Sequence, residues 1–168
     1  LKQSIGDFDF YLGRDGFNFK GTAILSAVDV LPPSLFAIDS EYIPGLDGVR
    51  GVYYLSEVSQ IKLAQIFSKN DSFKKSIYAL EFFTTVNMLD VAVSVFYFNK
   101  NIIVGTGLTT DIEGFLTYFE SSFSFVNNED KRLRTSFGLS KMWNEYWSST
   151  IEYYYNGFGA TTYKDYET

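Results

Sequence analysis

Seven charged residues fall on the small-residue side of segments that alternate bulky apolar side chains with small ones, and three of them, Glu120, Arg134 and Glu152, lie in mid-segment. Neighbouring residues of a strand point to opposite faces, so these charges share one face with Gly, Ser, Ala and Thr. A lone charge in a protein core is costly unless it is paired, whereas a water-filled lumen tolerates it. We therefore predict that these residues line a pore and select its solutes: Arg50, Lys62, Glu81, Glu120, Arg132, Arg134 and Glu152. The competing interpretation is that the strands form a barrel with a plugged interior, in which the charges pair with one another.

Two absences limit the reactions that this chain could catalyse. It contains no His and no Cys, which removes the commonest general base, the commonest nitrogen ligand for metals and any disulfide framework. Glu120 and Glu152 could act as an acid and base pair, but the segment Lys131–Trp143 separates their strands. We therefore expect a protein that is not an enzyme and has no cofactor.

Three aspartates lie in or beside a proline-containing stretch, and their oxygens are of the type that Ca²⁺ prefers. They are Asp29, Asp39 and Asp47. Their spacing matches no EF-hand loop, and exposed acidic residues are commonly just solvated. We therefore predict no metal site.

The stretch Asp90–Asn156 sets the predicted fold. Val93 and Val95 lie on one face of its first segment, and Ser94 lies on the other. The same alternation continues with only a few turn residues between segments, which predicts consecutive antiparallel strands. These strands are Asp90–Asn99, Ile102–Thr110, Gly114–Val126, Lys131–Trp143 and Trp147–Asn156.

The preceding residues continue the pattern less regularly. A turn is predicted at Gly13–Gly16, and ten strands are predicted in all, eight of them from Leu46 onward. The connections alternate between the two ends of the sheet, and the longest fall on one end, as in outer-membrane barrels. The earlier strands are Asp7–Leu12, Phe17–Leu25, Leu46–Leu55, Gln60–Phe67 and Ser76–Val86.

Residues 26–45 break the alternation and contain all three prolines, so they are predicted to form a loop. The loop is rich in apolar side chains and needs cover. It either folds into the barrel mouth and narrows the pore, or packs on the rim or on a neighbouring chain.

The composition of the chain and the positions of its aromatic residues indicate the surroundings of the sheet. The chain is 46% hydrophobic and 19% aromatic, its mean hydropathy is near zero, and no apolar run reaches the roughly 20 residues of a membrane helix. Aromatic residues gather near the strand ends, where an interfacial girdle lies in membrane barrels. The prediction is an all-β, antiparallel up-and-down transmembrane β-barrel of about 8–10 strands. Residues 1–168 then form a single domain, or part of a larger barrel.

Leu31–Asp39 followed by Glu41–Arg50 forms a Pro-rich stretch that leads into a predicted strand, and Ile151–Gly159 is a Tyr-rich late strand. These two stretches resemble parts of porin-like bacterial outer-membrane proteins, including alginate-export-type barrels. Those proteins are considerably longer and usually finish on a strand with a terminal aromatic residue. We expect more barrel strands to follow Tyr163–Thr168 in the natural protein.

These observations lead to three functional hypotheses. The first is an outer-membrane channel for small polar solutes that contacts the lipid bilayer and forms a homo-oligomer or pairs with a partner barrel chain. The second is a structural or partner-binding barrel without an open pore. The third is a soluble β-barrel that binds an apolar ligand. The net charge of −6 and the absence of a long Lys/Arg cluster argue against nucleic-acid binding.

Overall fold

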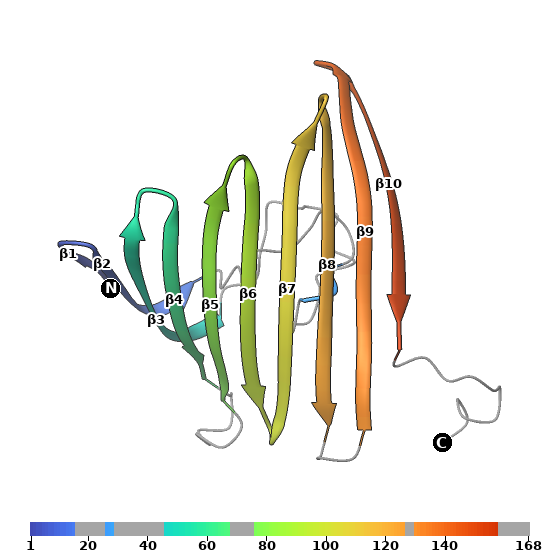
Figure 1. Ribbon diagram of the computed structural model, residues 1–168. Helices are drawn as coiled ribbons and strands as arrows, with labels where there is room; N and C mark the ends of the chain where they lie inside the picture. The colour runs from blue at the N-terminus through green and yellow to red at the C-terminus, as the bar shows by residue number, and fades with distance from the viewer. Residues whose placement is uncertain (16–25, 29–45, 68–75, 127–129, 158–168) are drawn as a thin grey trace.

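The computed structural model describes residues 1–15, 26–28, 46–67, 76–126 and 130–157, and these form one antiparallel sheet (Figure 1). The strands lie in the sheet in the order of the sequence, so each strand pairs with the next one along the chain. The strands are β1 (Lys2–Ile5), β2 (Phe8–Asp15), β3 (Leu46–Ser56), β4 (Ser59–Ile66), β5 (Ile77–Val86), β6 (Leu89–Phe98), β7 (Asn101–Ile112), β8 (Phe115–Val126), β9 (Asp130–Asn144) and β10 (Trp147–Asn156). Within these ranges, no helix is long and apolar enough to cross a membrane.

The eight strands predicted from Leu46 onward are confirmed, and three of their turns have a clear local cause. Each is a two-residue hairpin in which both residues have positive φ, as a type I′ turn requires. Asn and Gly adopt this conformation at little cost, and each of the three turns contains one of them. The turns are Asn87-Met88, Asn99-Lys100 and Glu113-Gly114.

The N-terminal strands differ from the prediction. Gly13–Asp15 does not turn but continues β2 alongside β3, where Arg14 lies opposite Asp47. The guanidinium of Arg14 donates to both oxygens of the Asp47 carboxylate, at 3.2 and 3.1 Å, and this cross-strand ion pair favours the extended strand. The chain turns earlier, at Gly6, and β1 was not predicted. The predicted strand Phe17–Leu25 lies outside the described residues.

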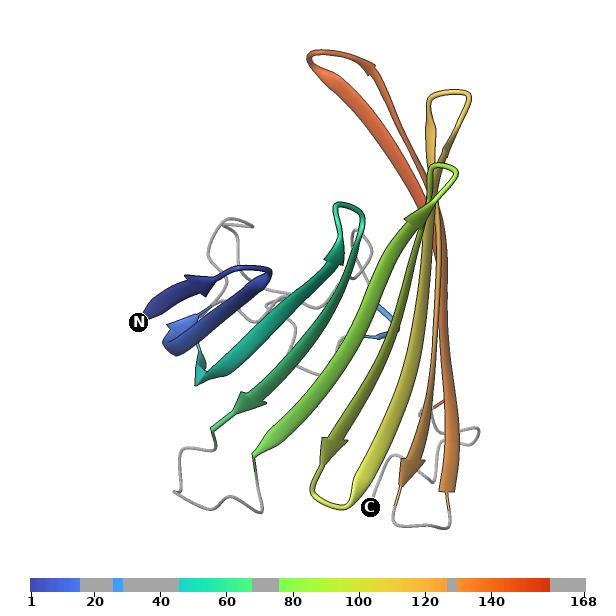
Figure 2. The ribbon, with the colours of Figure 1, turned by 60° about the vertical axis from the view of Figure 1, so that its left-hand side comes forward.

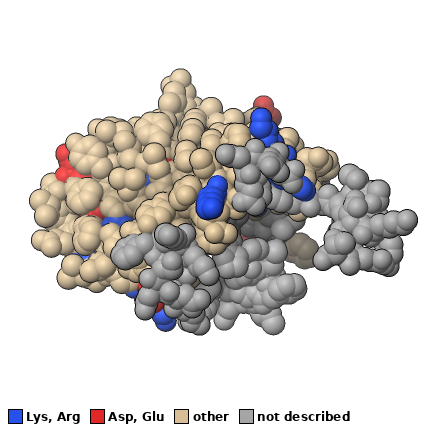
Figure 3. Space-filling view, turned by 90° about the horizontal axis from the view of Figure 1, so that it is seen from below, with Lys and Arg blue, Asp and Glu red and all other residues tan. Residues whose placement is uncertain are grey.

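The two faces of the sheet are occupied as the alternation predicts. Val93, Phe119 and Phe137 keep 42%, 37% and 44% of their surfaces exposed on the apolar face. Glu120, on the opposite face, is 1% exposed. Figure 3 views the molecule from the end at which β6 and β7 join, and charged side chains lie there in small separate groups among uncharged ones. We call the two sides the apolar face and the polar face.

The sheet is strongly curved but not closed. Figure 2 shows the strands twisting around a concave side, with Ser26–Val28 lying within the curve. β1 and β10 are the two edges, and they do not pair with each other. The expected antiparallel up-and-down order is therefore present in the described residues, whereas a closed barrel is not.

Candidate functional site: the polar face

All seven residues predicted to line a lumen lie on the polar face. The cross-strand register defines this face as a series of rows, one of which runs from Lys62 through Glu81 and Ser94 to Gly105. The same row continues through Ser122 to Arg134. Lys62, Glu81 and Glu120 are buried, whereas the other four are half-buried: Arg50, Arg132, Arg134 and Glu152.

Lys62 and Glu81 form an ion pair on the polar face. They lie directly opposite each other on β4 and β5, and Lys62 Nζ donates to Glu81 Oε1 at 2.7 Å. Both side chains are almost wholly removed from solvent. This pair matches the competing interpretation, in which the charges neutralise one another.

Glu120 binds a segment that is distant in the sequence. Its Oε2 accepts one hydrogen bond from the hydroxyl of Ser26 at 2.6 Å and another from the backbone N–H of Ala27 at 2.9 Å. Ser122, two residues along β8, donates its hydroxyl to the carbonyl of Ala27. The polar face therefore binds the backbone of Ala27 at both its N–H and its carbonyl, through Glu120 as the acceptor and Ser122 as the donor.

Val28 completes this contact through its side chain. A Cβ built on Gly105 would lie 2.7 and 3.1 Å from the two methyl carbons of Val28, so only glycine leaves room for them. Val28 also packs in a buried cluster with Ala64, Ala79 and Phe96. The predicted loop 26–45 therefore reaches the middle of the polar face at its described residues, 26–28.

Further along the polar face, Tyr118 connects β8, β9 and β10. Its hydroxyl donates to Glu152 Oε2 at 2.8 Å, and its ring lies over Gly138 of the intervening strand β9. A Cβ on Gly138 would overlap the ring. The glycine thus provides the space through which Tyr118 on β8 reaches Glu152 on β10.

The arginines of the polar face have their own contacts. The guanidinium of Arg50 lies 4.1 Å from the ring centroid of Tyr11, a cation–π arrangement. Arg132 donates through Nη1 to the carbonyl of Gly157 at 3.5 Å. Arg134 lies opposite Ser122 in the register. Solvent reaches these half-buried arginines, and it also reaches Lys2 of β1, whose amine lies 5.2 Å from the centroid of the same Tyr11 ring.

Several contacts could not be assigned from the sequence. Ser26, Ala27 and Tyr118 were not identified as binding residues. Two mid-strand glycines were a detectable signal of close approach nearby, because Gly105 faces Val28 and Gly138 faces Tyr118. Glu120 and Glu152 accept hydrogen bonds from different side chains, Ser26 and Tyr118 respectively. Asp47 pairs with Arg14, and Asp29 and Asp39 lie outside the described residues.

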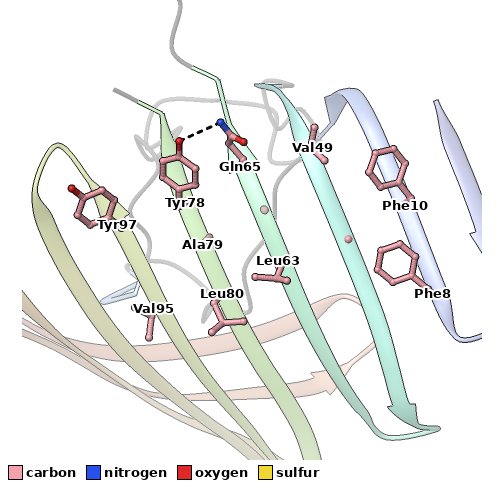
Figure 4. A pocket seen from close by; sticks show the side chains of 12 residues that line it. Phe8, Phe10, Val49, Leu63, Gln65, Tyr78, Ala79, Leu80, Val95 and Tyr97 are labelled. Carbon is pink, nitrogen blue, oxygen red and sulfur yellow. Dashed lines mark hydrogen bonds between the residues drawn. The ribbon is translucent and has the colours of Figure 1, made fainter. Parts of the chain in front are cut away.

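The apolar face contains a hollow of ≈ 540 Å³ that residues of β2 to β6 line (Figure 4). Its rim includes one hydrogen bond, from Gln65 Nε2 to Tyr78 Oη at 3.5 Å. Its other side chains are apolar or aromatic, including Phe8, Phe10, Leu63, Leu80, Val95 and Tyr97. Such a surface suits hydrocarbon better than water.

No protein-family model, curated protein or solved structure matches this chain. The resemblance to porin-like barrels therefore rests on the sequence patterns alone, and function must be argued from the geometry of the two faces.

The contact between Val28 and Gly105 predicts a cross-link. The chain has no Cys, so the double variant Val28→Cys/Gly105→Cys carries the only two thiols. The short distance from Gly105 to Val28 brings the thiols within reach of a disulfide, and we expect mild oxidation to form it nearly completely. Non-reducing electrophoresis after proteolysis between the two positions measures it.

The control moves the second cysteine two residues along the same face. A Cβ on Gly107 would lie 3.8 Å or more from its nearest neighbours, which are Glu120 and Ala92 and not Val28. Val28→Cys/Gly107→Cys should therefore remain reduced. Equal cross-linking of both pairs would show that Ser26–Val28 has no fixed position on the polar face.

Proposed function

We propose that this chain forms the wall, or part of the wall, of an outer-membrane β-barrel that passes small polar solutes. The observation that carries the proposal is the inverted distribution of side chains, with Phe119 and Phe137 exposed and Glu120 buried behind them. In a water-soluble sheet the burial would be reversed. Lipid on the apolar face accounts for the exposed rings, and the cover that Ser26 and Ala27 give to Glu120 on the inner, polar face accounts for its burial.

The extent of the apolar face supports a membrane location. Soluble monomers rarely expose contiguous apolar patches larger than a few hundred Å². Here exposed apolar or aromatic side chains occur on every strand from β1 to β10. The third hypothesis, a soluble barrel with an apolar ligand inside, receives no support, because the concave side carries Glu81, Glu120 and Ser136.

A channel is the function that fits the polar face best. Arg50, Arg132 and Arg134 are half-buried on this face, where they would attract anions entering the lumen. Small anionic or polar solutes are therefore the proposed substrates. The barrel would be completed by pairing of the free edges of β1 and β10 with further strands, from this protein or from a partner, because lipid cannot satisfy open backbone groups.

Conductance in planar bilayers tests the channel. We expect the protein, refolded into bilayers, to conduct with a preference for anions, and Arg132→Glu/Arg134→Glu to shift the reversal potential toward cations. Lys131→Glu is the matched control, because Lys131 adjoins Arg132 but lies on the apolar face, opposite Phe125. The channel proposal fails if the inserted protein does not conduct.

One observation favours the second candidate, a structural or partner-binding barrel. Ser26–Val28 covers the centre of the polar face, and two charges there, Lys62 and Glu81, are already paired. If the wild type is closed and Glu120→Ala, which removes the anchor of Ser26 and Ala27, is also closed, the polar face serves structure and not passage.

A further inference from the structure

Lys141 is a cation on the apolar face of β9. It shares this face with Leu139 and lies opposite Ser149 of β10, close to the hairpin that joins the two strands. Among the ion pairs of the described residues, none includes Lys141. A charged amine on a face that meets hydrocarbon is costly unless it reaches a polar layer, so its position near the strand end needs an explanation.

Two aromatic rings hold this amine in place. Lys141 Nζ lies 4.0 Å from the ring centroid of Phe115 and 4.7 Å from that of Trp143. The rings meet edge to face at 87°, and Trp143 Nε1 donates to Ser149 Oγ at 2.8 Å. Phe115 and Trp143 therefore form a fixed aromatic frame around the ammonium group, and Lys141 is not a freely moving surface lysine.

The neighbouring side chains indicate the layer in which this frame lies. The β9–β10 hairpin extends furthest at its end of the sheet (Figure 1), and Met142, Tyr146 and Trp147 are at least 72% exposed around it. Trp and Tyr concentrate at the boundary between lipid and water, and lysine extends its amine toward headgroups there. An anionic headgroup would supply the negative charge that the frame lacks.

We propose that Lys141, Phe115 and Trp143 form a binding site for the phosphate of an anionic lipid headgroup. The inference rests on the proposed membrane location. The ammonium group donates to phosphate oxygens while the aromatic rings contact the upper part of the acyl chains. The site would fix the depth of the β9–β10 hairpin at one surface of the membrane.

The two tryptophans of the chain, Trp143 and Trp147, are built-in reporters of this site. Their fluorescence is measured in bilayers of phosphatidylcholine mixed with phosphatidylglycerol, with bromine on the acyl chains of one lipid at a time. Bromine quenches only tryptophans that it contacts, so the two series give the relative affinity of the lipids. We expect the anionic lipid to be preferred about fivefold, the effect of roughly one lysine near a headgroup.

Variants separate the charge of Lys141 from general electrostatics. Lys141→Gln should abolish the preference and Lys141→Arg should keep it. Lys131→Gln removes an equal charge from the same face of β9 near its other end, and it should leave the preference intact. A preference that survives Lys141→Gln overturns the headgroup site.

The remaining outcomes distinguish this inference from the proposed function. Quenching by both lipids without a preference would refute the site and leave the membrane location standing. No quenching by either lipid would refute both. Inorganic phosphate should not change the emission of the protein in detergent micelles, and a saturable change would identify a site for a free anion instead of a lipid.

Discussion

Gly138→Ala is expected to destabilise the sheet by about 3 kcal/mol, at the upper end of the usual cost of overpacking. The added methyl group would overlap the ring of Tyr118. The ring cannot swing aside cheaply, because Tyr118 is 2% exposed and its hydroxyl is bonded to Glu152. The free energy of unfolding by urea in detergent micelles measures the loss.

A matched glycine provides the control. Gly107 of β7 lies on the polar face, as Gly138 does, and a Cβ there would make only ordinary contacts with Glu120 and Ala92. We expect Gly107→Ala to change the stability by less than about 1 kcal/mol. In the background of Tyr118→Ala, Gly138→Ala should also become nearly neutral, because the overlap is gone. Equal effects of Gly138→Ala in both backgrounds would contradict the proposed packing.

Lys62→Met is expected to cost about 3–5 kcal/mol, the loss that follows when one partner of a buried ion pair is removed. Glu81 is 1% exposed and would lose its cross-strand cation in a site that solvent barely reaches. Replacing both residues, as Lys62→Met/Glu81→Leu, should recover most of the loss because both charges of the buried pair are then removed. The same unfolding measurement applies.

The size of this effect also indicates how wet the polar face is. An ion pair open to water contributes about 0–1 kcal/mol. A loss below about 1 kcal/mol for Lys62→Met would mean that the lumen water screens Lys62 and Glu81. The control is Arg14→Met, which breaks the exposed pair with Asp47 and should cost little.

Alternation of side chains was sufficient to predict the eight strands from β3 to β10 and their two faces. On β9, Leu133 and Phe137 point to one face and Arg134 and Ser136 point to the other. This orientation is predictable whatever surrounds the strand, because the period of two is a property of the extended backbone. The type I′ turns were equally local, since residues such as Asn87 tolerate positive φ.

The contacts between distant residues could not be predicted in this way. Ser26 and Glu120 are separated by 94 positions, and no periodicity links them. The strand character of Gly13 depends on its pairing with Gly48 of β3, whereas its sequence context indicates a turn. Closure of the sheet likewise depends on what pairs with the edges of β1 and β10, which alternation does not encode.

The central claim is that the apolar face meets lipid and the polar face meets water, and spin labels along β9 test it most directly. Single cysteines at Leu133, Phe137 and Leu139, and at Arg132, Arg134 and Ser140, are labelled in lipid vesicles. Collisions with oxygen report lipid, and collisions with a water-soluble nickel chelate report water. We predict that the first three labels collide mainly with oxygen and the second three mainly with nickel. Nickel access to the labels at Leu133, Phe137 and Leu139 equal to that of the other three would contradict the account.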